Sequence, residues 1–347
     1  MKSNQITELV HTIRAELNLT RGVSPRIENV FQHEDESLHL IASDRAEKSL
    51  LLGPGGRVAA ELAKRTSKKV TIYGADEILL RKHRLQLTKS RIKEIIPFAT
   101  SSQSRMLNYL QFMIEQELTY PTKPIQYDLT ASHNLKVALA FSGGIDSTSA
   151  TMILKESGIV PDAVMVNLGH EFQNPKDIKQ AEDWCNQQNI RLVKLELAGE
   201  NCDLINRVDA GRVHPCGECH NHIMDRVREY SVESKHEIIV TGELLPSGRQ
   251  AILVQEGLLI VHLPAALSLS KYRTESIAEK SGKKLFRRKF GCNLVAKSHS
   301  HGWKNIGPSI FRVVRELEAG VLTTGQGLEY IKDIIRHSPT DAGEQIE

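Results

Sequence analysis

The chain has 347 residues, of which 40% are hydrophobic and 25% are charged. These fractions exclude a disordered or fibrous protein, and the length predicts two domains or three. The longest apolar runs, such as 257–269, are shorter than the roughly 20 residues that cross a bilayer. The N-terminus has no apolar leader segment, so we expect a cytoplasmic protein with no membrane partner.

The net charge of +3 conceals two strongly basic blocks. Residues 57–93 contain eleven Lys and Arg against three Asp and Glu, and residues 271–304 contain ten against two. Each block therefore carries a net charge of +8, and the rest of the chain is acidic. Such blocks favour a polyanionic partner, either nucleic acid or the phosphates of a nucleotide, over two ordinary solvated faces.

The first third of the chain has the features of a small mixed domain. Asp44 is expected to cap the helix that follows it, and the stretch 120–134, with two prolines and little periodicity, predicts a linker. The expected elements are a helix at 7–17, a loop up to residue 30, a strand at 37–43, a helix at 45–52, a glycine turn, a helix at 57–65, a strand at 69–73 and a basic helix at 79–96.

After the linker, short apolar strands alternate with helices. Strands are expected at 137–141, 163–168, 192–197 and 237–241, and helices at 146–156, at 176–188 and after Cys219. This alternation predicts βαβ units, a parallel sheet and an α/β fold. We expect one domain over 1–119, a linker over 120–134, a second domain over 135–337 and a flexible tail over 338–347.

A glycine turn joins the first of these strands to its helix, in the sequence Ser142-Gly143-Gly144-Ile-Asp146-Ser147. Two glycines allow close backbone approach to an anion, and the N-terminus of the helix supplies free N–H groups. The hydroxyls of Ser142 and Ser147 add donors, whereas Asp146 suits either a Mg²⁺ ion or an ordering role in the loop. The pattern is neither a Walker A loop nor a dinucleotide fingerprint.

This S-G-G-x-D-S sequence resembles the signature of the PP-loop ATP pyrophosphatases, which cleave ATP between its α- and β-phosphates. The resemblance implies a parallel-sheet, HUP-type (adenine nucleotide alpha hydrolase-like) domain that binds ATP and Mg²⁺. It places Val166 near the adenosine, Gly242 near the nucleotide, and Lys271 on the phosphates, with Arg273 as a second candidate. By position, the pyrophosphate end of ATP is held by Ser142, Gly143, Gly144, Asp146 and Ser147.

Three of the five cysteines form a second candidate site. Cys216-Gly-Glu-Cys219 opens a helix, where thiol pKa values are commonly depressed, and Cys292 lies between a basic stretch and a glycine-containing loop. The odd count of cysteines argues against a disulfide framework. The residues leave open an iron–sulfur cluster with one open iron, a persulfide without a cluster, or zinc, with its further ligands among His214, His220, His222 or Cys292.

PP-loop enzymes that thiolate tRNA through a cluster carry a C-x-x-C pair and one later cysteine, and the pattern here resembles theirs. The 2-thiocytidine, 2-thiouridine and archaeal-type 4-thiouridine synthetases are examples. The resemblance favours a 4Fe-4S cluster, with zinc as the alternative, on Cys216, Cys219 and Cys292, which with Asp146 are the expected catalytic residues. The chain lacks the additional C-x-x-C pairs of the 2-thiouridine synthetases, so the substrate is less defined than the chemistry.

The turn Gly53-Pro54-Gly55-Gly56 resembles the G-x-x-G turn of KH domains, which clamps a nucleic-acid backbone. KH domains often carry a basic residue at the two middle positions, and this chain does not. The resemblance implies an α+β KH-like RNA-binding domain. The expected RNA contacts in the two basic blocks are Gly53, Gly56, Arg57, Lys64, Arg65, Lys68, Lys69, Arg287 and Arg288.

Together these features predict ATP-dependent sulfur transfer to a base of tRNA or another structured RNA through an adenylated intermediate. We expect sulfide or a persulfide carrier as the sulfur donor, and the sequence is compatible with a homodimer. One alternative is a sulfonucleotide enzyme, because 166–172 resembles the corresponding region of phosphoadenylylsulfate reductases. Another is an RNA-binding protein regulated by nucleotide. His299 and His301, near Cys292, are expected to be surface residues.

Overall fold

We analysed a computed structural model of the chain, which describes residues 3–19, 25–32, 37–121, 127, 135–169, 172–197, 202–284 and 290–336. Most of the expected linker and the whole expected tail lie outside these residues. The chain forms two compact units. Unit 1 comprises Met1–Leu87 and Phe112–Gln126, and unit 2 comprises Thr88–Gln111 and Tyr127–Glu347.

Unit 1 contains a three-stranded sheet in the order β1-β2-β3. Its strands are β1 (Ile27–Gln32), β2 (Leu38–Ala42) and β3 (Val70–Gly74), with β1 antiparallel and β3 parallel to β2. Apolar side chains of the sheet and helices form one core, which contains Ile6, Val10, Leu40, Leu62 and Ile72. The helices are α1 (Ser3–Glu16), α2 (Arg45–Leu52) and α3 (Arg57–Thr66), with the 3₁₀ turn η1 (Pro54–Gly56) between the last two.

The local predictions for unit 1 are confirmed except at its start. The Asp44 carboxylate accepts a 2.8 Å hydrogen bond from the Glu47 amide and caps α2, as expected. The loop expected up to residue 30 is wrong, because β1 begins at Ile27. Three of its six residues are partly buried and the other three are exposed, so β1 lacks the regular apolar alternation that identifies a strand.

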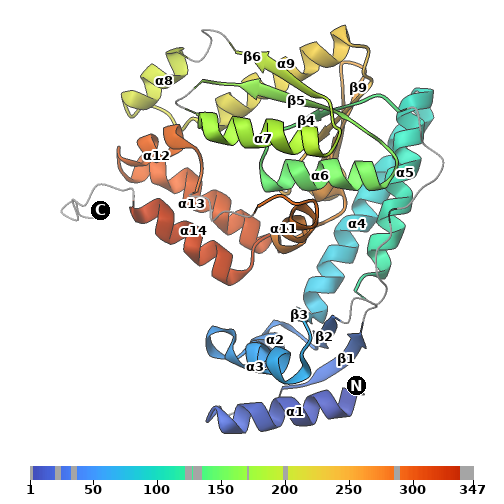
Figure 1. Cartoon of the computed structure of the whole chain (residues 1–347), viewed down its shortest axis with the longest axis vertical. Coiled ribbons are helices and arrows are strands. Elements are labelled where there is room, and N and C mark those ends of the chain that lie inside the picture. Colours follow the sequence, from blue (N-terminus) through green and yellow to red (C-terminus); the bar gives the residue numbers. More distant parts are fainter. Residues whose placement is uncertain are drawn as a thin grey trace. The chain divides into compact units, whose positions relative to one another are not determined.

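Two long helices, α4 (Ala75–Ile95) and α5 (Ser101–Thr119), each contribute to both units. The turn η2 (Ile96–Phe98) joins them, and they run side by side in Figure 1. Within unit 1, Arg81 forms an ion pair with the fully buried carboxylate of Glu117. Within unit 2, Gln103 Nε2 donates to the carbonyl oxygen of Gly257 at 2.7 Å. A buried charge with a cationic partner avoids the cost of lone burial.

Unit 2 is built on a six-stranded, mostly parallel sheet in the order β6-β5-β4-β7-β9-β8, which confirms the expected α/β fold. Only β8 is antiparallel, to β9. The chain order reverses beside β4, since β5 lies on one side of it and β7 on the other. Ligands of open α/β sheets bind at the carboxyl ends of strands at such a switch point. The strands are β4 (Val137–Ala140), β5 (Asp162–Asn167), β6 (Leu192–Glu196), β7 (Ile238–Thr241), β8 (Ile252–Gln255) and β9 (Leu258–His262).

Helices lie on both faces of this sheet: α6 (Ile145–Glu156) and α7 (Pro175–Gln187) cross one face in Figure 1, and α9 (Cys216–Glu233) lies on the other. Within the described ranges, no helix combines the length and apolarity needed to span a membrane. The remaining helices are α8 (Cys202–Asp209), η3 (Gly248–Ala251), α10 (Leu263–Ala266), α11 (Lys271–Lys280), α12 (Asn293–His299), α13 (Trp303–Glu318) and α14 (Thr324–Arg336).

Candidate functional site

The glycine loop runs from the carboxyl end of β4 into the N-terminus of α6, at the switch point of the sheet. Gly143 has φ +67°, and a Cβ there would lie 2.6 Å from the Cβ of Ala181, so only glycine fits. Ser142 Oγ accepts a 3.3 Å hydrogen bond from the Gly144 amide and lies 3.2 Å from Ser147 Oγ. Among the described residues no side chain caps α6, which leaves its first amides and dipole available to an anion.

Gly242 follows β7 and packs directly on the first turn of α6. A Cβ at this position would lie 2.5 Å from the Ser147 nitrogen and 2.7 Å from the Asp146 carbonyl carbon. Both atoms belong to the backbone, so the contact cannot be relieved by turning a side chain. The end of β7 thus supports the loop that begins α6.

Asp146 and Lys271 were expected separately, and the structure brings them together. Lys271 is the first residue of α11, and its Nζ lies 2.7 and 2.8 Å from the two Asp146 carboxylate oxygens. Thr274 Oγ1 donates to the same carboxylate at 2.8 Å. Burial raises the pKa of the nearby Glu275, Lys271 lowers it, and Asp146 raises it further. The charge of the Asp146 carboxylate is therefore neutralised by Lys271, which lies beside the N-terminus of α6.

Val166 lies at the end of β5 and is buried. The side chain of the following Asn167 is engaged, since it donates to Glu196 and accepts from the Gly169 amide at 3.1 Å. Two residues of the segment that resembles sulfonucleotide reductases, His170 and Glu171, lie outside the described residues.

The three cysteines of the second candidate site gather in unit 2. Cys216 and Cys219 occupy the first turn of α9, and Cys292 caps α12. The pKa of Cys219 is raised to about 12, mainly by burial and to a smaller extent by the nearby Cys292 and Cys216. Burial likewise raises the pKa of Cys216, although Arg312 lowers it. The expected depression by the helix N-terminus is therefore wrong, because desolvation and mutual repulsion outweigh it.

All five cysteines are free thiols, as the argument against a disulfide framework predicted. Cys219 and Cys292 pack against the core under the sheet. Throughout the described part of the chain, no group of three or more His, Cys, Asp or Glu side chains is arranged to hold a single metal ion.

Two of the candidate zinc partners are already hydrogen-bonded. His214 Nε2 lies 2.9 Å from Ser309 Oγ, and its Nδ1 accepts from the Cys216 amide at 3.4 Å. His220 Nδ1 lies 3.3 Å from a carboxylate oxygen of Glu243. These contacts favour roles in positioning the C-x-x-C turn over metal ligation.

The prediction that His299 is a surface residue is wrong, whereas His301 is exposed as expected. His299 is 1% exposed, and its Nε2 lies 2.8 Å from Ser309 Oγ. Ser309 thus bridges the rings of His214 and His299. Its position ten residues further on, in α13, explains why the local sequence did not reveal the contact.

A polar chain of residues that sequence reasoning did not connect leads from the sheet to the cysteines. Thr241 Oγ1 lies 2.7 Å from His262 Nδ1, and Glu243 Oε2 lies 3.1 Å from the same atom. Burial lowers the pKa of His262, and Glu243 opposes this effect. Because Glu243 also contacts His220, it joins the end of β7 to the residue after Cys219. The sequence signal that could have revealed this cluster is the position of its residues at the carboxyl ends of adjacent parallel strands, where α/β sheets bind ligands.

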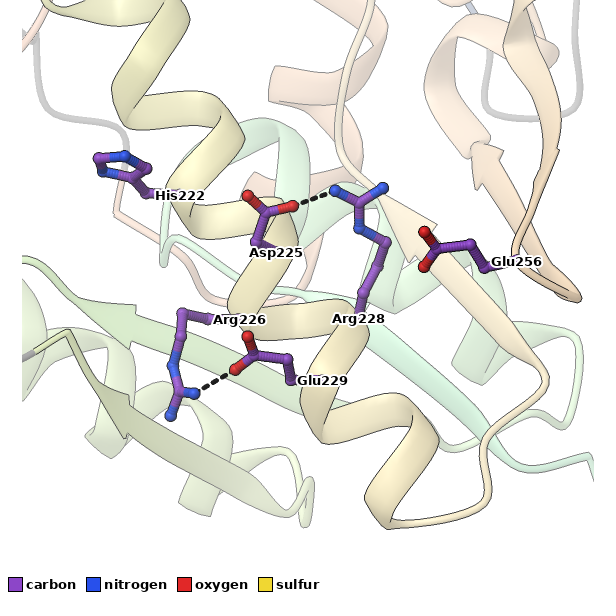
Figure 2. A pocket seen from close by; sticks show the side chains of 6 residues that line it. All are labelled: His222, Asp225, Arg226, Arg228, Glu229 and Glu256. Carbon is purple, nitrogen blue, oxygen red and sulfur yellow. Dashed lines mark hydrogen bonds and ion pairs between the residues drawn. The ribbon is translucent and has the colours of Figure 1, made fainter. Parts of the chain in front are cut away.

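A polar hollow of about 320 Å³ on α9 lies apart from both candidate sites (Figure 2). Its lining contains two ion pairs within α9, Arg226 with Glu229 and Arg228 with Asp225. Charges that neutralise one another on a single helix leave little to bind a ligand. None of the phosphate-loop or cysteine residues lines this hollow.

The predicted RNA contacts of the first basic block belong to unit 1, at and after the turn between α2 and α3. Gly53 and Gly56 both have positive φ, and Arg57 begins α3. The side chain of Lys64 is 80% exposed and its Nζ lies 3.9 Å from a carboxylate oxygen of Glu61, whereas Arg65 forms closer ion pairs with Glu16 and Glu61. Lys68 and Lys69 connect α3 to β3. The two predicted contacts of the second block, Arg287 and Arg288, lie outside the described residues.

Together, the sheet order and the loop define an α/β protein with a glycine turn at its switch point. No family model matches the chain. An uncharacterized protein of Methanocaldococcus jannaschii is 26% identical over 213 residues, which are 60% of this chain and 78% of that protein. The U34-tRNA thiolase NcsA from Methanococcus maripaludis, solved with its 4Fe-4S cluster, gives a TM-score of 0.40 at 18% identity, over 59% of this chain and 72% of that one. A likeness of this extent assigns no activity.

Proposed function

We propose that this chain is an ATP-dependent enzyme that replaces a carbonyl oxygen of a nucleobase in RNA, foremost tRNA, with sulfur. The observation that carries the proposal is the adjacency of the glycine loop and the three thiols within unit 2. Gly242 packs on the loop at Ser147. The next residue, Glu243, contacts His220, which follows Cys219. Activation by phosphate and attack by sulfur would therefore take place next to each other.

ATP with Mg²⁺ would bind at the loop, its pyrophosphate end held by Ser142, Gly143, Gly144 and Ser147 and its adenosine near Val166. Lys271, now paired with Asp146, would neutralise phosphate charge. Mg²⁺ prefers carboxylate oxygens, so it would compete with Lys271 for Asp146 and release the ammonium group toward the leaving pyrophosphate. Charge neutralisation and positioning are the main sources of rate in phosphoryl chemistry.

The thiols of Cys216, Cys219 and Cys292 would hold a 4Fe-4S cluster. Their half-buried, mutually repelling arrangement fits this group, because coordination removes the thiol protons that burial retains. The cluster, when bound, would supply an open iron that holds sulfide. Arg312, which lowers the pKa of Cys216, would help to offset the negative charge of the thiolates.

The reaction would proceed in two substitutions. The base carbonyl oxygen attacks the α-phosphorus of ATP, and pyrophosphate leaves with the electron pair of the broken P–O bond. Hydrosulfide then attacks the activated ring carbon, the C–O bond to AMP breaks, and the proton of the hydrosulfide is released. ATP, the carbonyl and hydrosulfide thus become AMP, pyrophosphate and the thiocarbonyl, with no net oxidation or reduction.

The RNA would be held through the two basic blocks. In unit 1, a KH-like domain would clamp the backbone at Gly53–Gly56, with Arg57, Lys64, Lys68 and Lys69 around it. The exposed ammonium group of Lys64 suits a phosphate contact. Arg65 would contribute less, since its guanidinium is already paired with two carboxylates.

Anaerobic purification followed by iron, sulfide and zinc analysis tests the cluster, with Cys216→Ala, Cys219→Ala and Cys292→Ala variants. Cys202→Ala is the matched control, because that thiol is exposed whereas the other three are partly buried. We expect about four iron and four sulfide per chain, lost in the three variants and kept in the control. Stoichiometric zinc that persists in Cys292→Ala would contradict the cluster.

Incubation with ATP, sulfide and unmodified tRNA tests the reaction itself. We expect AMP and pyrophosphate to form only when RNA is present, and mass spectrometry of the digested nucleosides to detect a base that has gained sulfur. Turnover of a sulfonucleotide without RNA would support the reductase alternative instead. RNA binding without ATP turnover under any sulfur supply would indicate a nucleotide-regulated binding protein.

A further inference from the structure

One face of α13 exposes two large aromatic rings. Trp303 is 71% exposed and Phe311 is 64% exposed, although the opposite face of the helix is buried through Ile306, Ser309 and Val313. Gly307 lies between the two rings in sequence and on the same half of the helix. A Cβ at Gly307 would meet nothing within 4 Å. Both side chains are therefore largely exposed to solvent.

Cations surround the two rings. The Arg315 guanidinium lies over the ring of Phe311, 5.9 Å from its centroid, and Lys304 and Arg312 are exposed on the same helix. Glu318 is the one acidic residue among the described exposed positions of α13. The face is thus net positive, which complements a phosphate backbone. Val314 is the one aliphatic residue among the exposed large apolar side chains of α13, so this face offers rings and cations and lacks a contiguous aliphatic surface.

The same helix passes the cysteine site. Arg312, the residue after Phe311, acts electrostatically on Cys216, and Ser309 bonds both histidines behind the C-x-x-C turn. A strand along the aromatic face would therefore follow the helix whose opposite, buried face borders the cysteine site. A nucleotide beyond the end of the stacked bases would turn around this helix to reach the sulfur.

We propose that Trp303 and Phe311 form a stacking surface for unstacked bases of the RNA substrate, with Lys304 and Arg315 contacting its phosphates. Sequence-specific and single-strand RNA recognition uses aromatic platforms in this way, because every base has a π-face. This inference rests on the proposed function, since it assigns the element that presents the base. It adds a site in unit 2 to the backbone contacts expected in the two basic blocks.

Tryptophan fluorescence of the whole protein provides a direct test. The chain has two tryptophans: Trp184 is 3% exposed and its Nε1 donates to Ser281, whereas Trp303 faces solvent. An oligouridylate of about ten nucleotides, within the span of single-strand sites, should quench the emission of Trp303. The quenching should disappear in Trp303→Phe and persist in Trp184→Phe.

Affinity measurements with the same oligonucleotide and with unmodified tRNA give the second arm. We expect Trp303→Ala and Phe311→Ala each to weaken binding by about 5- to 150-fold, the range of one base–aromatic stack. Trp303→Phe should retain most of the affinity. Phe98→Ala, which removes an 88% exposed ring elsewhere in unit 2, is the matched control and should bind as the unaltered protein does.

Three results would overturn the inference. Unchanged RNA affinity in the double variant Trp303→Ala/Phe311→Ala, with iron loading and ATP turnover retained, would refute the stacking surface and leave the proposed function intact. A shift of that variant from dimer to monomer at unchanged RNA affinity would assign the face to a second copy of the chain. Absence of any RNA binding at low salt, by the unaltered protein, would refute the RNA substrate as well.

Discussion

Replacement of Gly242 by alanine should disable the phosphate loop while the fold is kept. The added Cβ would lie 2.5 Å from the Ser147 nitrogen, and ordinary contact begins at 3.4 Å. The first turn of α6 must therefore move by about 0.9 Å relative to β7. A misplacement of about 1 Å costs on the order of a hundredfold in rate. We expect kcat/KM for RNA-dependent AMP formation to fall by about that factor.

The same substitution overpacks a buried contact, which costs about 1–3 kcal/mol. For a unit of this size, that should lower Tm by about 3 to 9 °C. Gly325→Ala is the control, because a Cβ there meets nothing within 4 Å and alanine favours the helix. It should retain full activity. A Gly242→Ala protein with unaltered kcat/KM would refute the idea that β7 positions the loop.

Four further outcomes follow from the charges and thiols. Lys271→Ala should lower kcat/KM for ATP about a hundredfold with little change in Tm, as measured by AMP release and thermal unfolding. At pH 8 iodoacetamide should label the exposed Cys202 and spare Cys185, whose pKa burial raises to about 11. Between pH 9 and 11 each such buried thiol should lower stability by up to about 1.4 kcal/mol per pH unit, because it ionises only in the unfolded chain, and denaturant titration measures this. The affinity for tRNA should fall steeply with salt, and Lys64→Ala should reduce that slope more than Arg65→Ala, whose guanidinium is already paired.

The central part of unit 2 could be predicted because its signals are local. The strand at 137–141 is a short apolar run that ends at a glycine pair, and the helix after it needs no distant partner to form. Asp44 likewise indicates where α2 begins, because a capping carboxylate accepts a hydrogen bond from an amide only three residues further along the chain. In these places sequence periodicity, turn chemistry and the final structure agree.

The parts that could not be predicted depend on tertiary contacts. The strands β8 and β9 are fully apolar or short, and such runs do not distinguish a buried strand from a buried helix. His299 has polar neighbours in sequence, yet it is buried because Ser309 satisfies its ring. The direction of the Cys219 pKa shift depends on burial and on Cys292, which is 73 residues away in sequence. The spacing of these residues along the sequence predicts neither their burial nor their contacts.

The pair formed by Asp146 and Lys271 spans 125 residues of sequence, and this distance has a consequence for synthesis. At roughly 5–20 residues per second, the loop would leave the ribosome about 6–25 s before its lysine does. Throughout that interval the newly made strand and helix would present an uncompensated carboxylate at the switch point of a half-built sheet. The nascent chain therefore has an anion-repelling turn until α11 arrives, which would delay nucleotide binding until α9, with its two cysteines, has been made.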